Sequence, residues 1–378
     1  MEVTNSVLKH IYKMAKLVVL NKPMIPALRG VYLFSDAYEG VPKNKYGTDK
    51  TFNILSAIAT NVNETMYITV MGNKNIPDKS ESMMLLLDDI KPIVDHGYKV
   101  NFHTEVNEHY ASTGGNSFAM FGCNPQGMLK YATTTTSNTP PEKSIPVDMV
   151  EFKEAIKKLY FSMGKDKYLR NLNGMHMEVV DNKIRLVSSD GWRLTLQDLP
   201  TTEEVAMEPI LMSAEFITIL SKLKDFTLYI KEGYLFAQTT TYIDGYDVFT
   251  TFISKPMEEK FPDYRYVIPK ARKHVFRFDT IELRDTLRKI VKAKNEKVEL
   301  VFSHDALKLT TDSKSYEIPP EEGLSHGLKL SVVFNPKFLL EGIEACDELD
   351  LCLSPNGENE PLDIYWGTNR HILMPIRK

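Results

Sequence analysis

Histidine and acidic side chains come together at one place where a metal ion could bind. His103, Glu105 and His109 carry imidazole and carboxylate groups, which are ordinary zinc ligands. Residues 100–106, however, alternate between apolar and polar in the manner of a strand, and the spacing of the three groups matches no familiar ligand set. The sequence therefore predicts no metal site.

Asp190 is the other residue that could take part in catalysis. It precedes Gly191, and an Asp-Gly pair between two alternating segments is typical of a two-residue hairpin turn, which explains both residues without catalysis. The chain contains no Walker loop, nucleophile elbow or dinucleotide fingerprint. We therefore expect no catalytic residue and no cofactor.

Cysteine usage and the first residues indicate where the protein works. The three cysteines, Cys123, Cys346 and Cys352, have no metal-ligand spacing and are too few for a disulfide framework, which favours a reducing cytoplasm. Residues 1–18 mix lysines with apolar residues, so we expect an amphipathic helix rather than a signal peptide or a membrane span.

Positive charge is segregated although the chain as a whole carries a net charge of −4. The segments near residues 5–16 and 280–294 each present a basic face, a third group of basic residues lies near 157–170, and the segments 82–95 and 335–348 are acidic. This segregation favours sequence-independent attraction to DNA phosphates from one side of the molecule. Solvated lysine faces and favourable charges at helix C-termini remain the alternative explanation.

The elements that position these groups repeat along the chain. From residue 144 the same order of a short strand, a helix of about three turns and three alternating strands occurs four times, with helices expected at 148–160, after Ser213, at 280–294 and at 335–345. The first copy begins with a strand expected at 145–147, and its helix carries an apolar stripe of Phe152, Ala155, Ile156 and Leu159. Tight turns are expected at 181–182, 232–233 and 244–245. Earlier, helices are expected at 5–18 and 82–95, and strands near 29–35, 98–105 and 117–122. We therefore predict six copies.

Two copies per domain predict an α+β protein of three similar domains. Their boundaries are residues 1–140, 141–256 and 257–378, and the first domain is divergent, with an inserted loop at 36–50. Such a repeat has open sheet edges that must close on themselves or pair with another subunit. A ring with helices lining a hole and sheets outside satisfies this requirement.

Residues 261–270 connect the second and third predicted domains. Pro262 and Pro269 fix φ and remove two backbone donors, which predicts an extended strap on the surface rather than a strand; an ordinary linker is the alternative. Together with the segments 189–194 and 374–377, this strap resembles the bacterial DNA polymerase III beta subunit, the sliding clamp. The resemblance is strongest over residues 161–270, and in the first third it is limited to residues 22–28.

The resemblance implies a function without catalysis. Members of that family are head-to-tail homodimers that encircle duplex DNA, and their polymerase and clamp-loader partners dock short linear peptides between the second and third domains. By position, the docking cleft of this chain would comprise Leu172, Ser189, Gly191, Trp192, Arg193, Leu194, Pro262, Tyr266, Val267, Ile372, Met374, Pro375, Ile376 and Arg377. A satisfied interdomain core is the alternative reading of these residues.

The remaining expected site residues concern DNA and ring closure. Ring closure would pair the strand that carries Phe118 and Met120 with the third domain of a second subunit. The DNA-contacting residues, taken from the basic segments and from the resemblance, would be Lys9, Lys13, Lys22, Lys157, Lys165, Arg170, Arg284, Arg288 and Lys292.

Three positions depart from the family pattern. Trp192 stands where a histidine is common, Tyr266 where an arginine is common, and Lys378 where many members end in leucine. A more aromatic cleft of this kind indicates a partner peptide adapted to it.

The functional hypothesis is a sliding clamp in a bacterial cytoplasm or nucleoid, or a phage protein that acts in a host cytoplasm. A clamp-like scaffold for transcription or repair partners is one alternative, and a nucleic-acid-modifying enzyme is the other.

Overall fold

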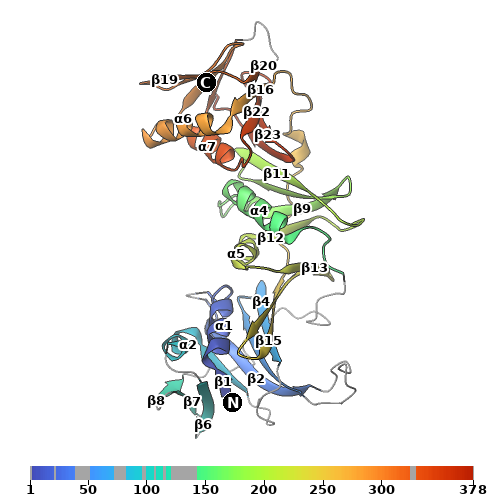
Figure 1. Cartoon of the computed structure of the whole chain (residues 1–378), viewed down its shortest axis with the longest axis vertical. Helices are drawn as coiled ribbons and strands as arrows, with labels where there is room; N and C mark the ends of the chain where they lie inside the picture. The colour runs from blue at the N-terminus through green and yellow to red at the C-terminus, as the bar shows by residue number, and fades with distance from the viewer. Residues whose placement is uncertain are drawn as a thin grey trace. The chain divides into compact units, whose positions relative to one another are not determined.

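The computed structural model describes residues 2–20, 23–38, 52–71, 82–95, 99–105, 108–113, 116–120, 143–323 and 329–377. The chain divides into two compact units (Figure 1): unit 1 comprises residues 1–145 and 215–256, and unit 2 comprises residues 146–214 and 257–378. All strand pairs of the described residues are antiparallel. The predicted α+β class is confirmed.

The first copy in unit 2 shows how the sequence sets each module. Asp148 caps helix α4 (Met149–Leu159), because its Oδ1 accepts the N–H groups of Val150 at 2.7 Å and Glu151 at 3.0 Å. The helix buries the predicted apolar stripe of Phe152, Ala155, Ile156 and Leu159. The stripe packs on strands β10 (Lys183–Ser189) and β11 (Arg193–Pro200), and β9 (Gly174–Val180) pairs with β10 in the same sheet.

One nine-stranded sheet extends through unit 2. Its order is β12-β9-β10-β11-β24-β23-β22-β16-β20, and the pairing of β11 with β24 joins strands from the second and third predicted domains. The strands not yet given are β12 (Ile210–Ser213), β16 (Phe276–Asp279), β20 (Glu322–Gly323), β22 (Asp350–Ser354), β23 (Leu362–Trp366) and β24 (Asn369–Leu373).

A second, four-stranded sheet of unit 2 has the order β19-β18-β17-β21. Helices α6 (Thr280–Lys292) and α7 (Pro336–Glu344) lie side by side and share one core with both sheets (Figure 1). The four strands are β17 (Val298–Phe302), β18 (Leu307–Thr310), β19 (Ser315–Ile318) and β21 (Leu330–Phe334).

Unit 1 repeats this plan with a seven-stranded sheet, β13-β14-β15-β4-β3-β2-β5, and a four-stranded sheet, β1-β6-β7-β8. Its helices are α1 (Asn5–Ala15), α2 (Leu87–Val94) and α5 (Ala214–Lys222), the last beginning one residue before the unit does. Its strands are β1 (Glu2–Thr4), β2 (Gly30–Tyr38), β3 (Phe52–Thr60), β4 (Glu64–Met71), β5 (Ser82–Leu86), β6 (Lys99–Glu105), β7 (Glu108–Thr113), β8 (Asn116–Met120), β13 (Thr227–Lys231), β14 (Tyr234–Ile243) and β15 (Tyr246–Ser254). No helix among the described residues is long and apolar enough to cross a membrane.

The leading strand of one copy joins the sheet of its neighbour. Strand β12 pairs with β9, β16 with β22 and β21 with β17; in unit 1, β1 pairs with β6 and β5 with β2. Where it occurs, this exchange covers a sheet edge and locks two copies together. It gives a physical reason for two copies per domain, while the three predicted boundaries stay a prediction.

Two predicted elements are wrong in part. The segment 82–95 is not one helix, because Met83, Met84 and Leu85 form a buried run in β5 before α2 begins. Residues 145–147 are not a strand: Ile145 donates one hydrogen bond to the Leu228 carbonyl at 2.8 Å, and Pro146 has no N–H to continue the ladder. Part of the predicted inserted loop, residues 39–50, and Lys22 lie outside the described residues.

Predicted tight turns are confirmed where two residues carry positive φ. At 181–182 the angles are 50° and 55°, at 232–233 they are 53° and 77°, and at 244–245 they are 52° and 93°. The turn after β10 differs by one residue. The backbone N–H of Asp190 donates to the Arg193 carbonyl at 3.3 Å, so Gly191 and Trp192 are the central residues of the turn. Gly191 supplies the positive φ of 90°.

Candidate functional site

The turn after β10 is held by its own side chains. Asp190 Oδ1 accepts the backbone N–H groups of Trp192 at 3.0 Å and Arg193 at 3.1 Å. Ser189 Oγ donates to the Arg193 carbonyl at 2.8 Å and accepts from Gly191 N–H at 3.2 Å. The backbone of Trp192 is thereby fixed, while its side chain is 66% exposed.

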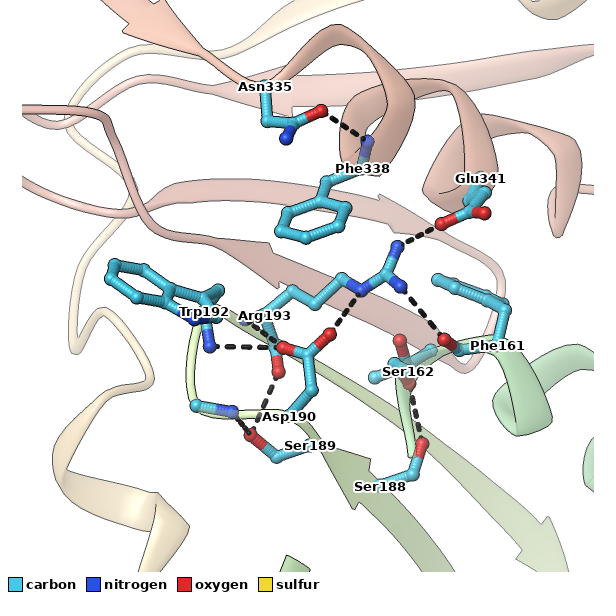
Figure 2. Close-up of polar contacts among 12 residues, drawn as sticks. Phe161, Ser162, Ser188, Ser189, Asp190, Trp192, Arg193, Asn335, Phe338 and Glu341 are labelled. Carbon is cyan, nitrogen blue, oxygen red and sulfur yellow. Dashed lines mark hydrogen bonds and ion pairs between the residues drawn. The ribbon is translucent and has the colours of Figure 1, made fainter. Parts of the chain in front are cut away.

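The side chain of Arg193 extends from this turn toward Glu341 (Figure 2) and is only 7% exposed. Its guanidinium donates to Asp190 Oδ2 at 2.9 Å, to the Phe161 carbonyl at 2.9 Å and to Glu341 on α7. The Phe161 and Phe338 rings lie 5.0 Å and 4.1 Å from its central carbon. Arg193 therefore joins the turn to a helix of the third predicted domain.

The C-terminal residues run beside the same turn. Strand β24 pairs with β11, and Met374 then donates its N–H to the Trp192 carbonyl at 3.0 Å. Two residues later Ile376 donates to the Val333 carbonyl on β21 at 2.7 Å. Met374, Pro375 and Ile376 are half-buried, so the tail is anchored by its backbone and partly presents its apolar side chains.

The predicted strap is more deeply buried than expected. Phe261 and Tyr264 are buried in a core cluster with Leu172, Leu194 and Ile372, so the expectation of a surface segment is wrong at these two residues. A 3₁₀ turn, η4 (Tyr264–Tyr266), interrupts the expected extended conformation. Aromatic side chains are buried here because the strap covers one face of the sheet.

Glu178 on β9 anchors the strap. It accepts hydrogen bonds from the Tyr264 hydroxyl and from Arg265 Nη2 at 2.7 and 2.9 Å, while His176 stacks on Phe261 with ring centres 5.1 Å apart. Burial alone would raise the pKa of Glu178, but these hydrogen bonds favour the charged form and hold its pKa below the ordinary value. Burial also raises the pKa of Tyr264 to about 12, so Tyr264 stays a hydrogen-bond donor.

The predicted docking residues divide into floor and surface. All belong to unit 2. The buried floor consists of Leu172, Arg193, Leu194 and Ile372. We use the term docking surface for Trp192, Pro262, Tyr266 and Val267, which are exposed, together with half-buried Met374, Pro375 and Ile376; Gly191 and Arg377 are also exposed, and Ser189 is half-buried.

His371 on β24 is fully buried on the side of the sheet that faces α7, with Nδ1 2.8 Å from Thr195 Oγ1. It packs so closely on Gly342 of α7 that a Cβ there would come within 2.3 Å of the ring. Burial, aided by the positive charge of Arg193, lowers the pKa of His371 to about 3. The ring is therefore neutral in the folded protein.

Acid is expected to destabilise the protein through His371. Below pH 6.5 His371 is protonated in the unfolded chain but stays neutral in the folded chain. The free energy of unfolding therefore falls by about 1.4 kcal/mol per pH unit until about pH 3. Urea unfolding between pH 7.5 and 4.5 measures the loss, and a His371→Asn variant, although less stable, should lack this component of the slope. Equal slopes for the two proteins would contradict the assignment.

Several of the predicted DNA-contacting residues already contact acceptors within the protein. In unit 1, Lys9 and Lys13 are exposed on α1. In unit 2, Lys165 and Lys292 are exposed, whereas the other cations contact acceptors: Lys157 with Glu154 at 2.6 Å, Arg170 with Glu259 at 3.1 Å, Arg284 with the Cys346 carbonyl at 3.0 Å, and Arg288 with Glu344 at 2.8 Å.

The predicted dimer residues lie on a terminal strand. Phe118 and Met120 belong to β8, which ends the order β1-β6-β7-β8 and pairs only with β7 among the described strands. The side-chain surroundings of these two residues, and of His103, Glu105 and His109, lie outside what the structure describes. Elsewhere in the described residues no group of acidic, histidine or cysteine side chains could hold a metal ion.

Sequence reasoning missed the residues that support the turn. Phe161, Phe338 and Glu341 contact Arg193 from positions 32, 145 and 148 residues away in sequence. Glu178 likewise reaches the strap over 86 residues. Contacts between residues so far apart in the sequence leave no local periodicity, so they can be identified only from the fold.

Comparisons with known proteins agree with this architecture. Residues 146–263 match the family model described as DNA polymerase III beta subunit, central domain. A beta sliding clamp of Pseudomonas putida is 26% identical over 258 residues, covering 64% of this chain and 68% of the relative. The solved sliding clamp of Bacillus subtilis has a TM-score of 0.82 at 16% identity, covering 100% and 98% of the two chains. A Pseudomonas aeruginosa clamp solved with griselimycin bound has a TM-score of 0.77 at 17% identity, covering 100% and 99%.

Proposed function

We propose that this chain, a divergent member of the DNA polymerase III beta subunit family, is a sliding clamp that encircles duplex DNA and tethers a polymerase. The repeated modules, locked in pairs by exchanged strands, are the observation that carries the proposal, because they build continuous antiparallel sheets with helices along them. A tether of this kind raises the local concentration of its partner and needs no reacting group. The chain is not an enzyme.

Partners would dock on the docking surface by a short linear peptide. Trp192, Tyr266 and Val267 offer exposed apolar area above a rigid, buried floor, which suits the side chains of an extended peptide. Met374 adds an adaptable thioether at the edge. Since Tyr266 and Trp192 are both aromatic, the preferred partner peptide carries apolar or aromatic anchors at these contacts.

Removing residues 374–378 is expected to weaken partner-peptide binding at least tenfold. The deletion removes half-buried apolar side chains from the docking surface and the N–H that fixes the Trp192 carbonyl. Fluorescence anisotropy with a labelled peptide from the cognate polymerase measures the loss. The oligomer should stay intact by light scattering, and unchanged affinity would reject the docking assignment.

Duplex DNA would be held without sequence preference. Exposed Lys9, Lys13, Lys165 and Lys292 would meet phosphates directly, and Lys22 and Lys157 belong to the same proposed set. Arg170, Arg284 and Arg288 would first have to exchange their protein acceptors for phosphate. Such contacts weaken with salt, so they would help loading more than they retain a closed ring.

A homodimer would close the ring by strand pairing, with its subunits head to tail. Strand β8 ends one four-stranded sheet and β19 ends another, so each offers backbone groups at an open edge in the described part of the chain. Pairing β8 of one subunit with β19 of the other would cover both edges. The other end of the second sheet is already contacted by the tail at Val333.

The decisive experiment is synthesis on primed circular DNA with the cognate polymerase and clamp loader in a cytoplasmic extract or a purified system. A sliding clamp should lengthen the products only when the loader and ATP are present, and should be lost when the circle is linearised. Absence of stimulation would reject the replicative role in favour of a scaffold, and nucleotide modification by the chain alone would favour an enzyme. A stable monomer in light scattering at micromolar concentration would contradict the dimer.

A further inference from the structure

The guanidinium of Arg193 is poorly placed to contact a docked peptide. Its side chain is 7% exposed, and it already donates to Asp190, to the Phe161 carbonyl and to Glu341. The rings of Phe161 and Phe338 lie within 5.0 Å and 4.1 Å of its central carbon (Figure 2). Reaching a partner would break these charge-assisted bonds inside a buried site, at high cost.

The contacts of Arg193 form a continuous connection from α7 to the tip of the turn. Glu341 on α7 binds one end of the guanidinium, and Asp190 Oδ2 binds its Nε at 2.9 Å. The other oxygen of Asp190 accepts the N–H of Trp192 at 3.0 Å. Helix α7 is itself fixed at this end, since the Asn335 cap accepts the N–H of Phe338 at 3.4 Å.

This connection ends at Trp192, whose side chain lies at the tip of the turn. Trp192 is 66% exposed, and it has backbone contacts on both sides, with Asp190 Oδ1 and with Met374 N–H. An exposed indole on an ordered backbone binds a partner without first losing the conformational freedom of the turn. If the turn were mobile, binding would have to remove its conformational freedom, and the affinity would be weaker.

We propose that Arg193 is a positioning residue: held by Glu341 and acting through Asp190, it keeps the 189–193 turn in one conformation, so that Trp192 is presented already ordered to the partner peptide. This inference rests on the proposed docking function and makes α7 part of the framework that orders the docking surface. It makes Glu341, which touches no part of the docking surface through the contacts described, a determinant of partner affinity.

Trp192 itself can report the effect without any partner. The chain contains two tryptophans, and Trp366 is buried, so a Trp366→Phe background leaves Trp192 as the sole tryptophan, which can be excited selectively over the tyrosines. In that background Glu341→Gln and Arg193→Lys should at least double the amplitude of the fast component in time-resolved fluorescence anisotropy. Glu344→Gln, one turn further along α7 and paired with Arg288, is the matched control and should leave it unchanged. An unchanged fast component in both test variants would overturn the proposal.

Binding of griselimycin, the ligand of the Pseudomonas aeruginosa clamp, then separates this inference from the docking proposal. We expect Trp192→Ala to weaken binding about tenfold and Glu341→Gln three- to tenfold, with the Glu341→Gln effect absent in the Trp192→Ala background. An equal Glu341→Gln effect in both backgrounds would overturn positioning through Trp192 while leaving the docking surface standing. Binding that Trp192→Ala leaves unchanged would reject the docking surface and with it the role given to Arg193.

Discussion

Replacing Asp363 with alanine is expected to lower the free energy of unfolding by about 3–5 kcal/mol, because the change strands two cations beside a fully buried position. Asp363 on β23 is 0% exposed and accepts from Arg370 Nε at 2.8 Å, from Arg370 Nη2 at 2.6 Å and from Arg272 Nε at 2.9 Å. Arg370 also donates to the Pro269 carbonyl at 3.1 Å, so this carboxylate secures the end of the strap. Replacing Asp363 therefore removes a negative charge and also weakens the contact of Arg370 with the strap.

Thermal and urea unfolding of unit 2 in the whole chain measure this effect. Glu360→Ala is the matched control, because Glu360 makes only an exposed pair with Lys273 at 3.3 Å, for which less than about 1 kcal/mol is expected. Asp363→Asn should lie between the two, since an amide keeps the shape and loses the charge. Comparable destabilisation by Asp363→Ala and Glu360→Ala would show that the Arg272 and Arg370 pairs contribute little.

Local sequence patterns predicted the modules well because the physics of each module is local. The apolar stripe of α4 and the positive-φ turn at 181–182 both follow from residues within a few positions of one another. The same reasoning failed over 82–95, where a buried strand run and a short helix add up to one helix-length apolar segment. Tertiary burial decides such cases.

For the candidate site, the sequence proposes a set of residues but does not show how each of them is placed. Trp192 and Tyr266 were identified through resemblance, and their exposure suits a docking role. Arg193 was assigned with them, yet its side chain is buried by Glu341 and Phe338, which lie more than 140 residues away. Likewise, the basic face of α6 was read from spacing alone, while Arg288 in fact pairs with Glu344 across the neighbouring helix.

Replacing Glu317 with proline is expected to weaken the proposed dimer on the order of 100-fold, without unfolding the subunit. The backbone N–H of Thr311 donates to the Lys314 carbonyl at 2.8 Å, so these two residues, which directly adjoin β18 and β19, form a hydrogen-bonded pair in register with the ladder. Such pairs alternate along an antiparallel ladder, so Tyr316 bonds back to β18 whereas Glu317 directs its N–H to the open edge. Proline there deletes an outward donor and places a ring where the partner's β8 would lie, yet it spares the β18 bonds.

Glu317→Ala is the control that isolates the backbone effect. It keeps the N–H and loses only the exposed pair with Lys308 at 3.4 Å, so its dimer should match the wild type within a few-fold. Light scattering and sedimentation across a dilution series give the dissociation constants, and circular dichroism confirms that both variants are folded. If the proline variant stays dimeric at the dilution where the wild type does, β19 is not the closing edge, and the second subunit must pair elsewhere on the third predicted domain.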